Sequence, residues 1–111
     1  MQREQILSAL QPNIVDENVM ALGGERVRFR ELTGAARDAL YDSVKDRAGN
    51  SAFEATLIAA TVVDEAGEPL FCRDDIEALR AGRKPLLEEL AQIAMRLNGL
   101  GNRAQEEATK N

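Results

Sequence analysis

The sequence has no histidine, and its only cysteine is Cys72. Histidine has the unperturbed pKa nearest neutrality and is the commonest metal ligand, so its absence argues against histidine acid–base chemistry and most zinc sites. A single cysteine forms no disulfide within the chain, which is typical of a reducing compartment, and no histidine is present to activate it as a nucleophile. We therefore expect no catalytic residue, no metal and no cofactor, with Cys72 a buried or half-buried packing residue.

Aromatic residues make up only 4% of the chain, so we expect a core of leucine, isoleucine and valine carried on helices. The net charge of −5 repels phosphate backbones, and no basic run with interleaved aromatics offsets it, which disfavours nucleic-acid binding. The most apolar stretch, residues 57–63, is too short to cross a membrane, and we see no signal peptide. A soluble, cytoplasmic protein is expected.

Apolar residues recur mostly with helical spacing, which predicts a mainly α fold: a small helical domain with a short N-terminal β-hairpin. Residues 1–101 are expected to form one domain, because no repeat or linker divides them. Within it, residues 1–12 are expected to be a short helical or frayed start that Pro12 ends. Residues 102–111 have almost nothing apolar to bury and are predicted to be a polar C-terminal tail.

The hairpin is expected within residues 18–32, the only strand-like region of the sequence. Alternation of apolar and other residues on both sides of a Gly-Gly pair is typical of two strands joined by a tight turn. The pair is Gly23-Gly24, and the alternating apolar residues are Val19 and Ala21 before it and Val27 and Phe29 after it.

Caps and apolar spacing predict four helices after the hairpin. The first runs from about residue 34 to residue 47, with Thr33 as its N-cap. The second and third begin with capping-box patterns at residues 51–54 and 74–77, and Pro85 suits the first turn of the last. The residues expected on their buried faces include Leu40, Val44, Phe53, Leu57, Ile58, Val62, Ile76 and Leu79, and Asn98-Gly99 is expected to end the last helix.

Residues 62–79, VVDEAGEPLFCRDDIEAL, carry six carboxylates around one glycine and one proline. A calcium loop that began at Asp64 would place Ala66 at its third position and Pro69 at its sixth, where an oxygen ligand and a glycine are needed. A catalytic acid pair needs one carboxyl with a raised pKa, whereas most of these acids are expected at helix starts or beside a turn, where ionisation is favoured. We interpret the segment as a connector between helices.

The order of residues in this connector resembles the tail assembly chaperones of long non-contractile-tailed bacteriophages. The upstream run VRFRELTGAARDAL and the downstream LNGLG followed by a polar, acidic EEATKN end are similar to the same family. The resemblance covers roughly residues 19–111, and the order of the motifs is its strongest part. The residues that carry it in the connector are Val63, Asp64, Gly67, Pro69, Leu70, Phe71, Asp75 and Leu79.

The resemblance implies a protein that acts while the phage tail is built in the host cytoplasm and is absent from the finished particle. Members of the family coat the tape-measure protein and keep its hydrophobic helices soluble until tail-tube subunits polymerise around it. They self-associate, including into spiral arrays. Many are also made in a longer, frameshifted form that is thought to recruit tail-tube protein, and this chain would then be the short form.

Two sets of residues are candidates for protein contacts. An apolar stripe would receive a helical client, although the core is the commoner place for such a stripe in so short a chain, which needs most of its leucine and isoleucine inside. Three arginines on one strand face would pair with an acidic surface of another subunit, although solvated arginines are the commoner case. Met20 and Met95 are expected to fill the core. The client-binding candidates are Phe71, Leu79, Leu86, Leu90, Ile93 and Leu97, and the self-association candidates are Arg26, Arg28 and Arg30.

Two other classes of function compete with the chaperone. A small helical transcription or antitoxin-type regulator would need a basic recognition helix, whereas the predicted helices are acidic or mixed. An enzyme would have to use Asp64 or Cys72, for which the sequence offers no partner base. We therefore favour a non-enzymatic protein that acts by presenting surfaces to other proteins.

Overall fold

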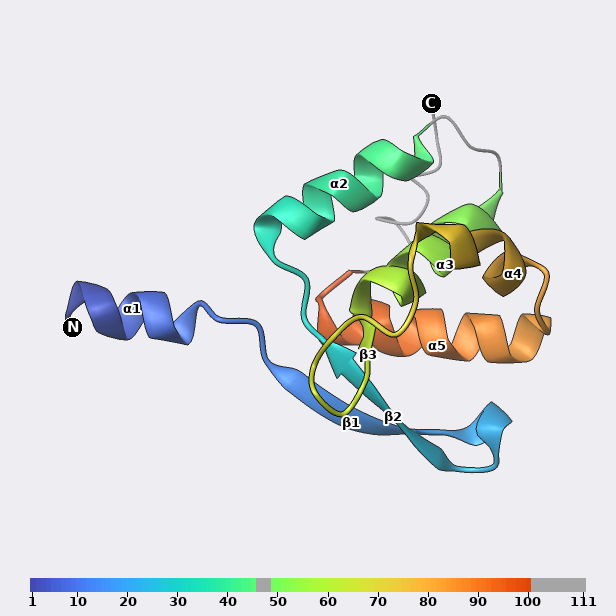
Figure 1. Ribbon diagram of the computed structural model, residues 1–111, viewed down its shortest axis with the longest axis horizontal. Helices are drawn as coiled ribbons and strands as arrows, with labels where there is room; N and C mark the ends of the chain where they lie inside the picture. Colours follow the sequence, from blue (N-terminus) through green and yellow to red (C-terminus); the bar gives the residue numbers. More distant parts are fainter. Residues whose placement is uncertain (46–48, 101–111) are drawn as a thin grey trace.

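The computed structural model describes residues 1–45 and 49–100. Helix α3 (Asn50–Thr61) is the central element, and α2 (Gly34–Val44), α4 (Ile76–Arg80) and α5 (Lys84–Leu97) pack around it (Figure 1). The sequence predicted one buried face for this helix. Instead the helix is buried on most of its surface. Most of its residues are alanine, leucine, isoleucine or threonine, and Glu54 is its one charged residue. Its buried residues are Ala52, Phe53, Glu54, Ala55, Leu57, Ile58 and Thr61.

The predicted hairpin is confirmed, with its first strand placed earlier in the chain. Strand β1 (Ile14–Val19) pairs antiparallel with β2 (Glu25–Arg30). The turn between them is a 3₁₀ segment, η1 (Met20–Leu22), followed by two glycines with positive φ, Gly23 at 70° and Gly24 at 86°. Ala21 therefore lies in the turn rather than in a strand.

A third strand was not predicted from the sequence. Helix α3 ends at Thr61, and β3 (Val62–Val63) continues from it and pairs antiparallel with β2, giving the sheet order β1-β2-β3. Val62 was expected on a helix face. Both valines are buried in the strand, because the chain leaves the helix at the point where β2 offers a free edge.

The hairpin places alternate residues on opposite faces of the sheet. Val19 and Phe29 are buried in the same core as Leu90 and Ile93 of α5. Glu17, on this face of β1, forms an ion pair with Arg96 of α5. The sheet therefore rests on α5, and its other face carries the side chains of residues 16, 26 and 28.

Of the four predicted helix starts, two are confirmed and two are wrong. Thr33 Oγ1 accepts a hydrogen bond from the backbone N–H of Ala36 at 3.0 Å, as expected of an N-cap. The first predicted capping box does not form, because α3 begins at Asn50 and Ser51 Oγ accepts from Arg80 instead. Glu54, the other half of that predicted box, is turned into the protein and is only 8% exposed.

The second predicted capping box is displaced by two residues. A short 3₁₀ helix, η2 (Arg73–Asp75), precedes α4, and the Asp75 carboxylate accepts from the backbone N–H of Cys72 at 2.8 Å. Asp74 and Glu77 do not form the expected cap. Thus Asp75 closes the turn of the connector that leads into α4.

The last helix begins and ends as predicted. Pro85 lies in its first turn, and Gly99 follows it with a positive φ of 67°. The N–H of Leu100 closes the end by donating to Met95 at 2.8 Å. Asn98 Oδ1 also accepts from the backbone N–H of Leu32 at 2.7 Å, so the helix end is tied to the segment that follows β2.

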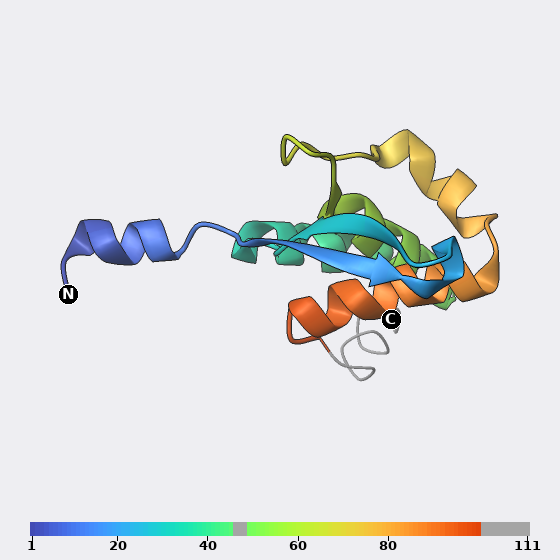
Figure 2. The ribbon, with the colours of Figure 1, turned by 90° about the horizontal axis from the view of Figure 1, so that it is seen from below.

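Helix α1 (Arg3–Ala9) confirms the helical start predicted before Pro12. Figures 1 and 2, which are at right angles to each other, both show it standing clear of the helices and the sheet. The predicted tail, residues 102–111, and the predicted end of the first helix at residue 47 lie outside the described residues. No helix in the described part of the chain is both long and apolar enough to span a membrane.

Candidate protein-binding surfaces

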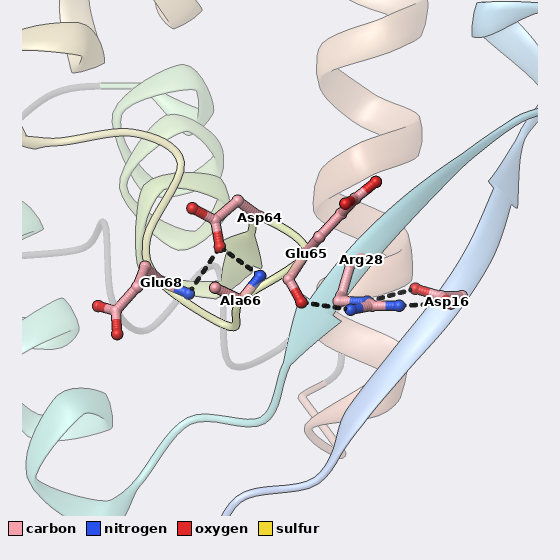
Figure 3. A network of polar contacts seen from close by, with 6 residues as sticks. All are labelled: Asp16, Arg28, Asp64, Glu65, Ala66 and Glu68. Carbon is pink, nitrogen blue, oxygen red and sulfur yellow. Dashed lines mark hydrogen bonds and ion pairs between the residues drawn. The ribbon is translucent and has the colours of Figure 1, made fainter.

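The acidic connector begins with a tight turn that Asp64 organises (Figure 3). One carboxylate oxygen of Asp64 accepts from the backbone N–H groups of Ala66 at 2.8 Å and Glu68 at 3.0 Å. Gly67, with a φ of 82°, donates its N–H to the Asp64 carbonyl at 3.0 Å. The predicted turn is therefore confirmed, and the Asp64 side chain stabilises it.

Arg28 ties this turn to the hairpin, as Figure 3 also shows. Its Nε and Nη2 donate to the two carboxylate oxygens of Asp16 at 2.8 and 3.2 Å, and its Nη1 donates to the carbonyl of Glu65 at 2.8 Å. The hydrogen bond from Arg28 lowers the pKa of Asp16 below its ordinary value. This arginine, a predicted self-association residue, already has partners within its own chain.

The other two arginines of that prediction lie on the same strand. Arg26 is exposed and Arg30 is half-buried, and neither side chain makes a hydrogen bond or ion pair with the described residues. They present positive charge at the open face of the sheet.

Within residues 1–45 and 49–100, no group of three or more carboxylate or thiol side chains is arranged to hold a metal ion. Cys72 is exposed, which corrects the expectation that it packs in the interior. It is the residue that precedes η2, and its backbone is extended. What the molecule offers instead are apolar surfaces.

The first apolar surface is a groove of about 110 Å³ between α4 and α5, which we call the α4–α5 groove. Three of the predicted client-binding residues meet here: Leu79 and Leu86 are half-buried at its walls, and Leu90 lies deeper and is buried. The remaining lining residues are Ala78, Gly82, Arg83 and Leu87.

The hairpin tip lies at the same end of the molecule as the turn between α4 and α5, opposite α1 (Figures 1 and 2). Glu89 of α5 holds it there, because its two carboxylate oxygens accept from the backbone N–H groups of Met20 at 2.6 Å and Ala21 at 2.8 Å. Met20 is 76% exposed and Leu22 is 40% exposed. The expectation that Met20 fills the core is therefore wrong, whereas Met95 does so.

The second apolar surface is a groove of about 290 Å³ between α2, α3 and the segment that precedes α4, which we call the α2–α3 groove. Its helical walls are built largely of alanine, and Phe71, another predicted client-binding residue, borders it from the connector. Small side chains leave room for an approaching helix. The groove is lined by Ala36, Ala39, Leu40, Ser43, Thr56, Ala59, Ala60, Phe71, Cys72, Arg73 and Ile76.

The predicted apolar stripe is thus divided among three places. Leu79, Leu86 and Leu90 share the α4–α5 groove, and Phe71 borders the α2–α3 groove. Ile93 is buried in the core, and Leu97 is half-buried against it. Sequence reasoning did not select the groove alanines, since pairs such as Ala59-Ala60 are common in ordinary helices.

No protein-family model and no curated protein matches the sequence. The structure is similar to the solved structure of the bacteriophage HK97 tail assembly chaperone, with a TM-score of 0.64 and 24% sequence identity. The match covers 88% of this chain and 98% of that chain. At this identity the likeness shows the fold alone. That fold occurs in a phage tail assembly chaperone, the family whose motifs the sequence resembles.

Proposed function

We propose that this chain is a phage tail assembly chaperone that binds the tape-measure protein and keeps its hydrophobic helices soluble while the tail is built. The observation that carries the proposal is the shared fold, which extends over nearly all of the HK97 tail assembly chaperone. The order of the connector motifs suggests the same family from the sequence, so the motif order and the fold support one assignment. The protein would act in the host cytoplasm, without catalysis, and be absent from the finished particle.

The finer features of the proposal come from the family resemblance. The chain would self-associate, and it would be the short form of a frameshifted pair whose longer form contacts the tail-tube protein. It would need no cofactor, because a protein that shields apolar helices acts through its surfaces alone.

We place the client at the apolar end opposite α1, on the α4–α5 groove and the hairpin tip. Leucines at a groove between helices are suited to the i, i+3 and i+4 side chains of an amphipathic helix. Met20 is exposed at the hairpin tip, at the same end of the molecule, and methionine adapts to irregular apolar partners because its side chain is flexible and polarisable. A client made of many different helical segments requires such adaptable contacts.

Co-expression with an insoluble fragment of the tape-measure protein tests this function. The wild-type chain is expected to move the fragment into the soluble fraction, and Met20→Asp to reduce that soluble amount severalfold, because a charge would be placed in the apolar contact. Met20 is exposed, so its replacement leaves the core intact. The matched control is Asn18→Asp, which adds the same charge at an exposed residue of the same hairpin.

The outcomes separate the assignment from the position of the site. If the wild-type chain leaves the fragment insoluble, the chaperone function is wrong. If Met20→Asp and a fold-checked Leu86→Asp both solubilise the fragment as well as Asn18→Asp does, the client binds elsewhere on the molecule.

A further inference from the structure

Helix α1 is an amphipathic arm whose apolar side is uncovered. Ile6, Leu7 and Leu10 lie within one sector of the helical wheel and are 46%, 44% and 69% exposed. No residue of α1 is buried in the part of the chain that the structure describes, and the helix stands away from the fold in both views (Figures 1 and 2). The arm therefore presents an apolar face toward solvent.

A helix as short as α1 is stable only when its apolar face is packed against another surface. It has 7 residues, fewer than the roughly 12–15 below which isolated helices are marginal in water. The N–H of Gln2 donates to the side chain of Gln5 at 2.7 Å and orders the first turn, but such local bonds add only a fraction of a kcal/mol to about 1 kcal/mol. Burial of the apolar face is the remaining source of helix stability.

The segment that joins α1 to the sheet is short and anchored at Asn13. The N–H of Asn13 donates to the Glu31 carboxylate at 2.8 Å, and the N–H of Glu31 donates to the Asn13 carbonyl at 2.9 Å. Only Gln11 and Pro12 separate this anchored residue from Leu10, at the end of the helix, and proline restricts the backbone further. A reversal of the arm onto its own fold would have to be made within these two residues.

The α2–α3 groove provides a surface of matching chemistry. Alanines form much of its helical walls, so a helix backbone can approach closely, and Phe71 and Ile76 supply larger apolar contacts. Its volume of about 290 Å³ is near the lower end of the range of roughly 300–1,000 Å³ found for ligand pockets, which suits a few aliphatic side chains. Arg73 lines the groove, and Glu4 on the arm has the opposite charge.

We infer that α1 of one copy docks into the α2–α3 groove of a second copy, with Ile6, Leu7 and Leu10 as its anchors. One short helix covers far less than the roughly 800 Å² per partner of a stable interface, so a foreign protein that met the arm alone would bind weakly. A second copy brings both an arm and a groove, and contacts made in both directions or along a row of copies reinforce one another. The arm has one basic and one acidic residue, so it joins two chains of net charge −5 without adding repulsion.

Light scattering on the full chain over a range of concentrations tests the contact. The mass of the wild type is expected to rise with concentration in the micromolar range, as is that of the control Ser8→Asp on the polar side of the arm. Leu7→Asp disables the arm and Ala39→Glu disables the groove, so each alone should remain monomeric. Both positions are exposed or half-exposed, and circular dichroism checks that the variants fold.

Mixing the two disabled variants is the decisive step, because one retains a working groove and the other a working arm. An equimolar mixture should reach the mass of a dimer at the highest concentrations and no larger mass, because it retains a single arm–groove contact, which binds more weakly than two. A wild-type mass that stays monomeric at every concentration, a Leu7→Asp variant that associates as the wild type does, or a mixture that stays monomeric would each overturn the inference.

The native thiol of Cys72 provides a second test that does not depend on affinity. It is exposed, lines the α2–α3 groove and is the only cysteine of the chain. With oxidised glutathione as the oxidant, Leu10→Cys should form disulfide-linked dimers severalfold faster than the control Ser8→Cys. Adding Cys72→Ser should abolish these dimers, and dimers that persist without Cys72 would show that arms meet arms and would contradict the proposed contact.

Discussion

At the scale of single residues, Glu54 shows how position changes the behaviour of an ordinary side chain. It lies on the central helix, is 8% exposed, and faces the carboxylate of Glu88 and the ammonium of Lys84. Burial raises the pKa of Glu54, Glu88 raises it further, and Lys84 acts in the opposite direction. The sequence suggested a helix cap at this position, and the fold made it a buried acid.

Glu54 is therefore expected to lower the stability of the protein at neutral pH. The carboxyl of Glu54 holds its proton more tightly in the folded chain than in the unfolded chain, where its pKa is about 4.3. The stability that the protonated carboxyl contributes is therefore fully present below that pH and is lost as the pH rises through the pKa of Glu54 in the folded chain. Glu54→Gln should raise the free energy of unfolding at pH 7 by roughly 0.5–1 kcal/mol, with almost no difference at pH 4.

Urea denaturation followed by circular dichroism at the two pH values measures this effect. Glu68→Gln is the control, because Glu68 is exposed and should change stability little at either pH. A Glu54→Gln variant that is less stable than the wild type at pH 7 would mean that the Glu54 carboxylate makes a favourable contact.

At the scale of elements, the connector is a structural device rather than a site of chemistry. Its turn is closed by Asp64, held to the hairpin by Arg28, and continued by a bridge between Val63 and Pro69. Asp75 then orders the entry to α4. The carboxylates that first suggested a metal loop are thus partly used to satisfy backbone N–H groups, and local spacing was sufficient to predict the turn.

Gly67 is the residue of this turn that should tolerate substitution least. Its φ of 82° is unfavourable for residues with a Cβ, and an added Cβ would lie 3.2 Å from Cδ1 of Ile14. Gly67→Ala should lower the free energy of unfolding by about 1–2 kcal/mol, and Gly67→Asn by less, because asparagine adopts positive φ more readily. Thermal melting measures both.

Gly34→Ala is the matched control for this prediction. Gly34 begins α2 with a helical backbone, and nothing lies within 4 Å of the Cβ that it would gain. This substitution should be neutral or slightly stabilising. Equal losses at both glycines would show that backbone conformation is not the cause.

At the scale of the whole molecule, α3 connects nearly all of the parts. It packs against α2, α4 and α5 and continues into the third strand of the sheet. Phe53 is fully buried on it and stacks on Tyr41 of α2, with ring centroids 6.5 Å apart. A core with so few aromatic residues depends heavily on each one.

Phe53→Ala should accordingly destabilise the whole domain in one step. A loss of about 3–5 kcal/mol is expected from the cavity and the lost burial, a large part of the roughly 5–15 kcal/mol available to a small domain. The far-UV circular dichroism signals of helix and sheet should be lost together at a lower temperature. A two-stage transition, with the hairpin surviving α3, would show that the sheet is stable without this helix.

The sequence by itself determined the features that depend on a few neighbouring residues. The cap at Thr33, the Gly-Gly turn of the hairpin, the turn at Asp64 and the end of α5 at Asn98-Gly99 follow from side chains and backbone preferences that act over one or two turns. The motif order that pointed to tail assembly chaperones is likewise a local property, because each motif marks an element boundary.

Only the tertiary structure decided which surfaces meet. It paired residues 62–63 with β2, buried Glu54 and Ile93, exposed Met20 and Cys72, and placed Leu79 beside Leu86. Each of these outcomes depends on contacts between residues far apart in the chain, and an apolar residue has the same local signal whether it will lie in the core or at a groove. The α2–α3 groove exists for the same reason, since it lies between three segments that the sequence keeps apart.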